Sequence, residues 1–193
     1  MSAREEWGWF AKHNARGIPG SRALAAELER IVRETGIKSP ITTPRGLGAR
    51  LHYLDTDAGR EALRNAGVRP GTLRRWQQGK AKPSKGSREK IERAYREIRT
   101  RNMLRSGALT KRLQQEGRGT RVEIYPVNQA NVPAQHQRDV PQRSIRVRDW
   151  APITHAWAAG DDAQLDQAWG DIIADIASEY VAYAYVSGIG IGA

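Results

Sequence analysis

Apolar residues recur at helical spacing through the first half of this sequence. The first such stretch follows Ser21, a residue type that caps helices, and stops at Gly36, a residue type that ends them. Its spacing of i, i+4, i+7 and i+8 predicts one amphipathic helix. A loop broken by two prolines follows, and similar spacing predicts a second helix through Asp55. The apolar positions are Leu24, Leu28, Ile31 and Val32 in the first helix, and Leu47, Leu51 and Leu54 in the second.

Residues 1–20 show no such repeat and are predicted to form an irregular arm. They contain three aromatic residues, Trp7, Trp9 and Phe10. Large aromatic side chains gain most from burial, so this cluster indicates an arm docked onto its own domain rather than a ligand site.

The segment DAGREALRNAGVRPGTLRRWQQGK has the pattern of a helix-turn-helix. A short helix stops at Gly67, because glycine allows the positive φ that a tight turn needs. Val68 then plugs the angle between the helices, and a second helix places Leu73 and Trp76 on its inner face. The outward side chains of that helix are expected to meet base edges in the major groove and flanking phosphates. They are Arg69, Thr72, Arg74, Arg75 and Gln78.

A basic loop follows the second helix after Gly79 and is expected to lie along a phosphate backbone. Its lysines are Lys80, Lys82 and Lys85. Ser87 is predicted to cap a further helix, whose inner stripe contains Ile91, Ala94, Tyr95 and Ile98. We therefore predict a helical DNA-binding domain over residues 21–99. The alternative is a small helical bundle with a basic surface.

The pattern changes from helical to alternating after a predicted basic helical linker at residues 100–119. Alternation and β-forming residues predict two strands joined by a long polar loop. Helical spacing then returns for two helices, and the chain closes on a predicted strand. The five elements are strands 120–127 and 144–148, helices 150–159 and 162–181, and strand 180–192. The predicted fold class is therefore mostly α plus α+β, with a small acidic α/β domain at residues 120–193.

The net charge of +11 is concentrated in the middle of the 193-residue chain. Residues 45–121 contain 21 basic and 7 acidic residues. Residues 1–44 contain 7 basic and 5 acidic residues, and residues 122–193 contain 4 basic and 9 acidic residues. Each Lys or Arg beside a phosphate releases a counterion, so this block is typical of a nucleic-acid-binding surface. The alternative is a generic solvated basic surface.

The sequence gives little indication of a metal site, a phosphate-binding loop or a membrane segment. The chain has no cysteine, which excludes disulfides and thiolate ligands, and its four histidines are scattered without ligand spacing. The glycines of SGIGIGA precede no helix, so they do not indicate a phosphate loop. No apolar run approaches the roughly 20 residues of a membrane helix. We expect no cofactor, no metal site, no enzyme activity of its own and no membrane contact, in a cytoplasmic, nucleoid- or replicon-associated protein.

The order of parts, with GVRPGTLRRWQQGKAKPS and SREKIERAYREIR followed by a β-loop-β pair, two helices and a strand, resembles a known family. This family is the terminal proteins (Tpg) of actinobacterial linear chromosomes and linear plasmids. The resemblance implies binding to replicon-end DNA together with a telomere-associated protein and a DNA polymerase. It also implies covalent attachment to a 5′ end through a hydroxyl that acts as primer.

The resemblance places the priming hydroxyl on a threonine in the middle of the chain, which favours Thr120, then Thr110, with Ser144 as a further candidate. The alternative function is a helix-turn-helix transcriptional or plasmid or phage maintenance regulator, whose C-terminal domain forms homodimers or binds a partner. An RNA-binding accessory protein is a third hypothesis, which predicts a preference for RNA over duplex DNA.

Overall fold

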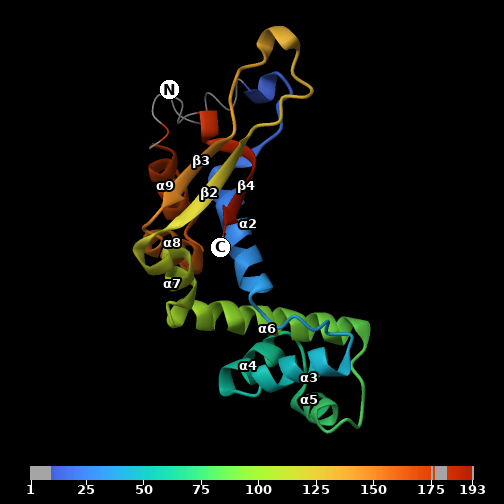
Figure 1. Cartoon of the computed structure of the whole chain (residues 1–193). Coiled ribbons are helices and arrows are strands. Elements are labelled where there is room, and N and C mark those ends of the chain that lie inside the picture. Colours follow the sequence, from blue (N-terminus) through green and yellow to red (C-terminus); the bar gives the residue numbers. More distant parts are fainter. Residues whose placement is uncertain (1–9, 175, 177–181, 193) are drawn as a thin grey trace. The chain divides into compact units, whose positions relative to one another are not determined.

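The computed structural model describes residues 10–174, 176 and 182–192 (Figure 1). It combines helices with a four-stranded antiparallel sheet, which confirms the predicted mixture of helix and sheet. The chain divides into two compact units. Unit 1 comprises Met1–Arg30 and Gly107–Ala193, and unit 2 comprises Ile31–Ser106.

This division differs from the predicted one at both boundaries of the helical domain. Most of helix α2 (Gly20–Glu34) belongs to unit 1, because its Glu27 carboxylate accepts a hydrogen bond from the backbone N–H of Ile191 in strand β4. Helix α7 (Ala108–Gln114), expected within a linker, also belongs to unit 1 and buries Leu109 and Leu113. A sequence pattern shows which side chains are apolar but not which distant strand they meet.

Unit 2 is built from four helices besides the end of α2, and α3, α4 and α5 lie on one side of α6 (Figure 1). Their bounds are Pro44–Tyr53 for α3, Asp57–Asn65 for α4, Pro70–Gln77 for α5 and Lys85–Arg105 for α6. The Thr43 and Thr56 hydroxyls cap α3 and α4 by accepting hydrogen bonds from the backbone N–H groups of Gly46 and Gly59. These local signals explain why the short helices begin where they do.

The interior of unit 2 contains the apolar positions that the helical spacing selected. Val68 is buried after the turn glycine, as predicted, and Trp76 is half-buried at the edge of the cluster. The buried members are Leu51, Leu54, Ala62, Leu63, Val68, Leu73, Ile91, Ala94, Tyr95 and Ile98.

The cap of α6 was predicted one turn too late. Ser84, not Ser87, is the N-cap, and its hydroxyl accepts a hydrogen bond from the backbone N–H of Ser87 at 3.2 Å. Both serines fit the sequence signal, and Gly86, a poor helix former, lies between them. The helix therefore begins at Lys85 and runs on to Arg105, which takes in the first part of the predicted linker.

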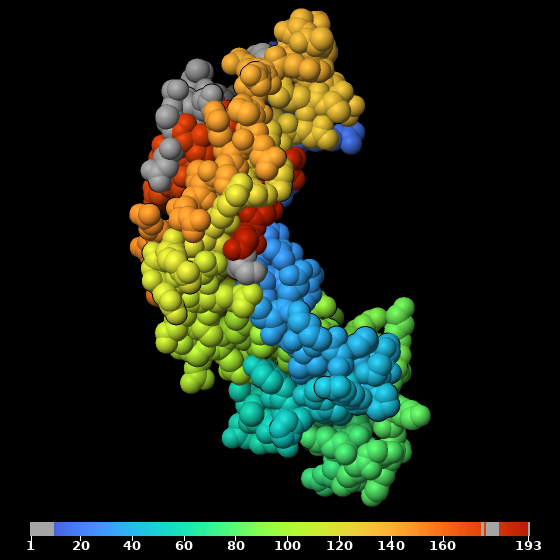
Figure 2. Space-filling model, in the orientation of Figure 1, coloured from blue at the N-terminus to red at the C-terminus, as the bar shows by residue number. Residues whose placement is uncertain are grey.

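Unit 1 contains the sheet, with strand order β1-β4-β2-β3 and every neighbouring pair antiparallel. The bounds are Ile18–Pro19, Thr120–Pro126, Arg143–Val147 and Tyr185–Gly192 for β1 to β4. The three longer strands were predicted. The loop between β2 and β3 includes a 3₁₀ turn at Ala134–His136 and stands beyond the end of the sheet (Figures 1 and 2).

Part of the predicted irregular arm is ordered into this sheet. Phe10 is buried, Arg16 forms an isolated β-bridge with Asn128, and β1 pairs with β4. Trp7 and Trp9 lie outside the described residues. The arm is thus an edge of unit 1 from residue 10 onward.

Helices complete unit 1: α7, a 3₁₀ turn at Gln115–Gly117, α8 (Ala151–Ala159) and α9 (Asp162–Ala174). The predicted continuation of α9 to residue 181 lies largely outside the described residues. Along β2 the side chains alternate, with Val122 and Ile124 buried and Arg121 and Tyr125 exposed. Among the described residues, no helix is long and apolar enough to cross a membrane.

Candidate nucleic-acid interface

A four-residue turn joins α4 to α5 and fixes the direction in which α5 leaves. Gly67 adopts φ +78°, a conformation that costs other residues energy, and its N–H donates to the carbonyl of Arg64 at 2.8 Å. The Val68 N–H then donates to the carbonyl of Leu63 at 2.9 Å, which directs the Val68 side chain inward. Pro70 occupies the first turn of α5, where its missing N–H costs nothing.

Helix α5 with its two caps, the following loop and the first residue of α6 carry every residue that the sequence predicted to contact DNA. All eight side chains are exposed, and within the described part of the chain none of them makes an ion pair or a side-chain hydrogen bond. They are Arg69, Thr72, Arg74, Arg75, Gln78, Lys80, Lys82 and Lys85. In Figure 2 the segment from α5 to the start of α6 forms part of the open surface, in green. These donors are free to meet an external acceptor.

Arg50 of α3 has the opposite environment, and sequence reasoning missed it. The residue is 6% exposed, and its guanidinium donates to the Glu92 carboxylate at 2.5 Å and to the carbonyls of Ser39 and Gly46 at 2.8 and 3.0 Å. The same group lies 5.3 Å from the centre of the Tyr95 ring. Arg50 therefore holds the loop before α3 against α6. A signal existed, because Arg50 falls on the same helical stripe as the predicted leucines.

Only unit 2 carries a net positive charge. Unit 2 has 19 basic and 7 acidic residues, a net charge of +12, whereas unit 1 has 13 and 14, a net charge of −1. Several unit 2 acids are already engaged: Asp55 and Asp57 by Arg60, Glu92 by Arg50 and Arg96, and Glu97 by Arg101. The excess charge is therefore left on other basic side chains, including those of α5 and its loop.

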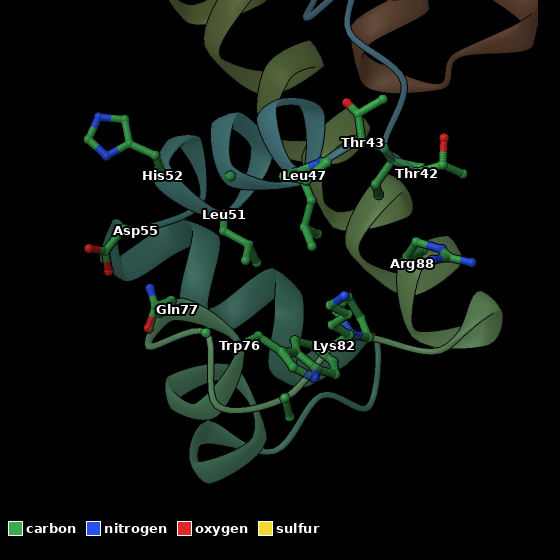
Figure 3. Close-up of a pocket in the computed structure, with 16 residues that line it drawn as sticks. Thr42, Thr43, Leu47, Leu51, His52, Asp55, Trp76, Gln77, Lys82 and Arg88 are labelled. Atoms are coloured by element: carbon green, nitrogen blue, oxygen red, sulfur yellow. The ribbon is translucent and has the colours of Figure 1, made fainter.

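A groove of about 630 Å³ lies beside this surface, within unit 2 (Figure 3). Leu47 and Leu51 point into it from α3, and Trp76 lies across from them on α5. Lys82 and Arg88 line it from the loop and from α6. The groove thus joins apolar and aromatic surface to two cations.

The three candidate priming hydroxyls have different exposures, and the preferred one is the least accessible. Thr120 has no exposed surface, and its hydroxyl donates to the carbonyl of Leu113. Thr110 is half-buried, with its hydroxyl 2.8 Å from that of Thr154. Ser144 is exposed and accepts a hydrogen bond from the Arg121 guanidinium at 2.6 Å. Burial therefore argues against Thr120, the residue that the resemblance favoured, and Ser144 is the most accessible of the three.

The histidines that looked scattered include one pair in contact. The rings of His13 and His136 stack with their centres 4.0 Å apart, so the start of unit 1 packs on the β2–β3 loop. Burial, followed by the charges of His136 and Lys12, lowers the pKa of His13. Among the described residues, no three His, Cys, Asp or Glu side chains gather in a way that could hold a metal ion.

Comparison with known proteins adds no relative from which a role could be carried over. No protein-family model matches the chain, and no curated protein and no solved structure is significantly similar to it.

Proposed function

We propose that α4, the turn and α5 form a helix-turn-helix that binds duplex DNA. The observation that carries this proposal is the set of eight exposed side chains without internal partners, on a unit of net charge +12. An exposed cation that its own protein leaves unpaired retains its full capacity to neutralise a phosphate. The turn glycine, the buried residue after it and the inward Leu73 supply the geometry that such a motif needs.

The residues would divide into two roles. Arg74 and Arg75 lie on α5 and are suited to base edges, because a guanidinium can donate two hydrogen bonds to guanine. Lys80, Lys82 and Lys85 are suited to phosphates, which fix register without reading sequence. Specificity and affinity should therefore be lost through different substitutions.

The proposal is tested by selecting binding sites from a random duplex pool and measuring affinity for the selected and a scrambled site. The double variant Arg74→Ala/Arg75→Ala should lose at least about 30-fold in the preference for the selected site, since each base contact contributes about 1–3 kcal/mol. Arg60→Ala is the matched control, because Asp55 and Asp57 already hold its guanidinium. A double variant that still prefers the selected site like the parent would refute α5 as the recognition helix.

We further propose that the chain acts as a terminal protein at replicon ends, with Ser144 as the acceptor. Its exposed hydroxyl lies beside Arg121, whose guanidinium would have to exchange Glu123 for a nucleotide phosphate. The hydroxyl oxygen would attack the α-phosphate of a deoxynucleoside triphosphate, forming an O–P bond as pyrophosphate leaves and the hydroxyl proton passes to solvent. A DNA polymerase would supply the metal ions.

Incubation with the cognate polymerase, Mg²⁺ and a labelled deoxynucleotide tests this role. The parent should become labelled and Ser144→Ala should not, whereas Thr110→Val should remain labelled. No label with any of the four nucleotides would exclude priming. A palindromic footprint with half-sites about 34 Å apart would instead indicate a dimeric regulator.

A further inference from the structure

The groove in unit 2 has two ends of different chemistry (Figure 3). Its apolar part is formed by Leu47, Leu51 and Trp76, which offer a flat ring a surface to stack on. Lys82 and Arg88 supply positive charge. A volume of about 630 Å³ lies within the range of small-ligand pockets, about 300–1,000 Å³.

Arg88 is the residue that most needs an external partner. It is half-buried, yet it makes no ion pair or side-chain hydrogen bond with any described residue. Its neighbour one helical turn on is Glu92, the position from which a carboxylate would normally pair with it. That carboxylate is held instead by Arg50 at 2.5 Å and Arg96 at 3.4 Å. Arg88 therefore lines the groove without a partner among the described residues, as does a second cation, Lys82.

We propose that this groove binds a nucleotide. The base lies on the Trp76 indole between Leu47 and Leu51, and the phosphate is held by Lys82 and Arg88. Base stacking on an aromatic side chain is sequence-tolerant, and the two cations supply the charge complementary to a phosphate. Polar groups of Gln77 and Asp55 line the groove as well and can meet the edge of the base.

The nucleotide can come from two sources. A base stacked within a duplex cannot enter a pocket, so the occupant is either a free mononucleotide or an unpaired nucleotide of DNA. The second source rests on the proposed DNA-binding function, because it needs the duplex held on α5. The first does not, so the two are separable by experiment.

The groove can be filled without damage to the fold. Gly48 lines it from the middle of α3, and a Cβ added there would meet nothing within 4 Å. Gly48→Phe should therefore occupy the groove and leave the melting temperature unchanged or raised, since glycine is a poor helix former. Gly170→Phe is the matched control, a glycine of helix α9 in unit 1 with equally open surroundings.

Calorimetry of the full chain with deoxyadenosine monophosphate, deoxyadenosine and inorganic phosphate tests the proposal. The monophosphate should bind at least 10-fold more tightly than either fragment, and Gly48→Phe should weaken it at least 10-fold while Gly170→Phe does not. Arg88→Gln should reduce its affinity to near that of deoxyadenosine. If none of the four deoxynucleoside monophosphates binds, or if binding survives Gly48→Phe at the parent's affinity, the proposal is overturned.

A second arm separates the sources and keeps the two proposals distinct. A duplex of the selected sequence with one unpaired nucleotide should bind the parent more tightly than the fully paired duplex, and Gly48→Phe should lose only that advantage. Monophosphate binding without this advantage would assign the groove to free nucleotide. An Arg74→Ala/Arg75→Ala variant that loses duplex but retains the monophosphate would show that the groove acts independently of α5.

Discussion

The arginines beside the sheet of unit 1 and those on helix α5 of unit 2 have different surroundings. In unit 1 the arginines beside the sheet are engaged: Arg30 by Glu27, Arg121 by Glu123 and Ser144, and Arg146 by the carbonyl of Gly119. In unit 2, Arg50 is engaged in the same way, but Arg74 and Arg75 have no partner among the described residues. If our proposal is right, DNA is bound by the unpaired cations of α5 and its neighbourhood, and net charge alone would not locate them.

The largest effect is expected from removing an engaged arginine of unit 2. Arg50→Ala leaves Glu92 without its buried partner and the Ser39 carbonyl without its guanidinium donor, so the free energy of unfolding should fall by about 3–5 kcal/mol. Urea unfolding followed by circular dichroism measures this loss. Arg93→Ala is the control, an exposed arginine of α6 for which we expect a change within about 0.5 kcal/mol. Equal losses in both variants would remove the distinction between engaged and unpaired arginines.

A smaller loss of stability is expected from the buried hydroxyl of unit 1. Thr120→Val keeps the shape of the side chain but removes the donor to the Leu113 carbonyl, which should cost about 1–3 kcal/mol. Ser144→Ala, at the surface, should change stability by less than about 0.5 kcal/mol. A Thr120→Val variant as stable as the parent would show that this hydroxyl is not structural.

The three lysines between the end of α5 and the first residue of α6 should affect the salt dependence of DNA binding. Replacing Lys80, Lys82 and Lys85 with Gln should reduce the slope of log affinity against log salt by about 2.7, since each phosphate contact contributes about 0.9. The same change at three exposed cations of unit 1, Arg22, Lys111 and Arg112, should leave the slope unaltered. If both triple variants changed the salt slope equally, DNA would not bind preferentially to unit 2.

The smallest effect is expected from pH, at the histidine pair of unit 1. The pKa of His13 is lowered in the folded protein, so the unfolded chain takes up its proton first as pH falls. Stability should therefore be unaffected above about pH 6.5 and should decline as pH falls from there through the lowered value. Unfolding measured between pH 8 and 5 should show a shallower decline in His13→Gln. If the stability of His13→Gln declined with pH just as that of the parent does, the decline would be due to other titratable groups.

Local spacing predicted much of the fold, because a helix or strand with one buried face must repeat its apolar residues at that period. The inward positions of unit 2, including Val68 and Leu73, followed from this rule. The positions of segments far apart in the sequence did not. Nothing near Glu27 indicates that its carboxylate meets Ile191, and for this reason the predicted start of the helical domain, residue 21, differs from the start of unit 2, Ile31.

The candidate site was predictable to a similar extent. Exposed cations on α5 follow from the helical face opposite Leu73, so the sequence was sufficient to locate them. The groove depends on how α3 lies beside the loop after α5, which no local pattern specifies. The burial of Thr120 likewise depends on its register in β2, opposite Val147 of β3.

The strand order has a consequence for the sequence of events during synthesis. A ribosome makes the chain from its N-terminal end, so all of unit 2 has been made once Ser106 has emerged. Strand β1 cannot pair at that stage, because Ile18 pairs with Val186 of β4, 168 positions later in the chain. Its neighbour in the sheet does not exist until translation has passed every other strand. Unit 2 can therefore fold before β4 has been synthesised, whereas the sheet of unit 1 cannot be completed until then. This order holds although the first residues of unit 1 are synthesised before any residue of unit 2.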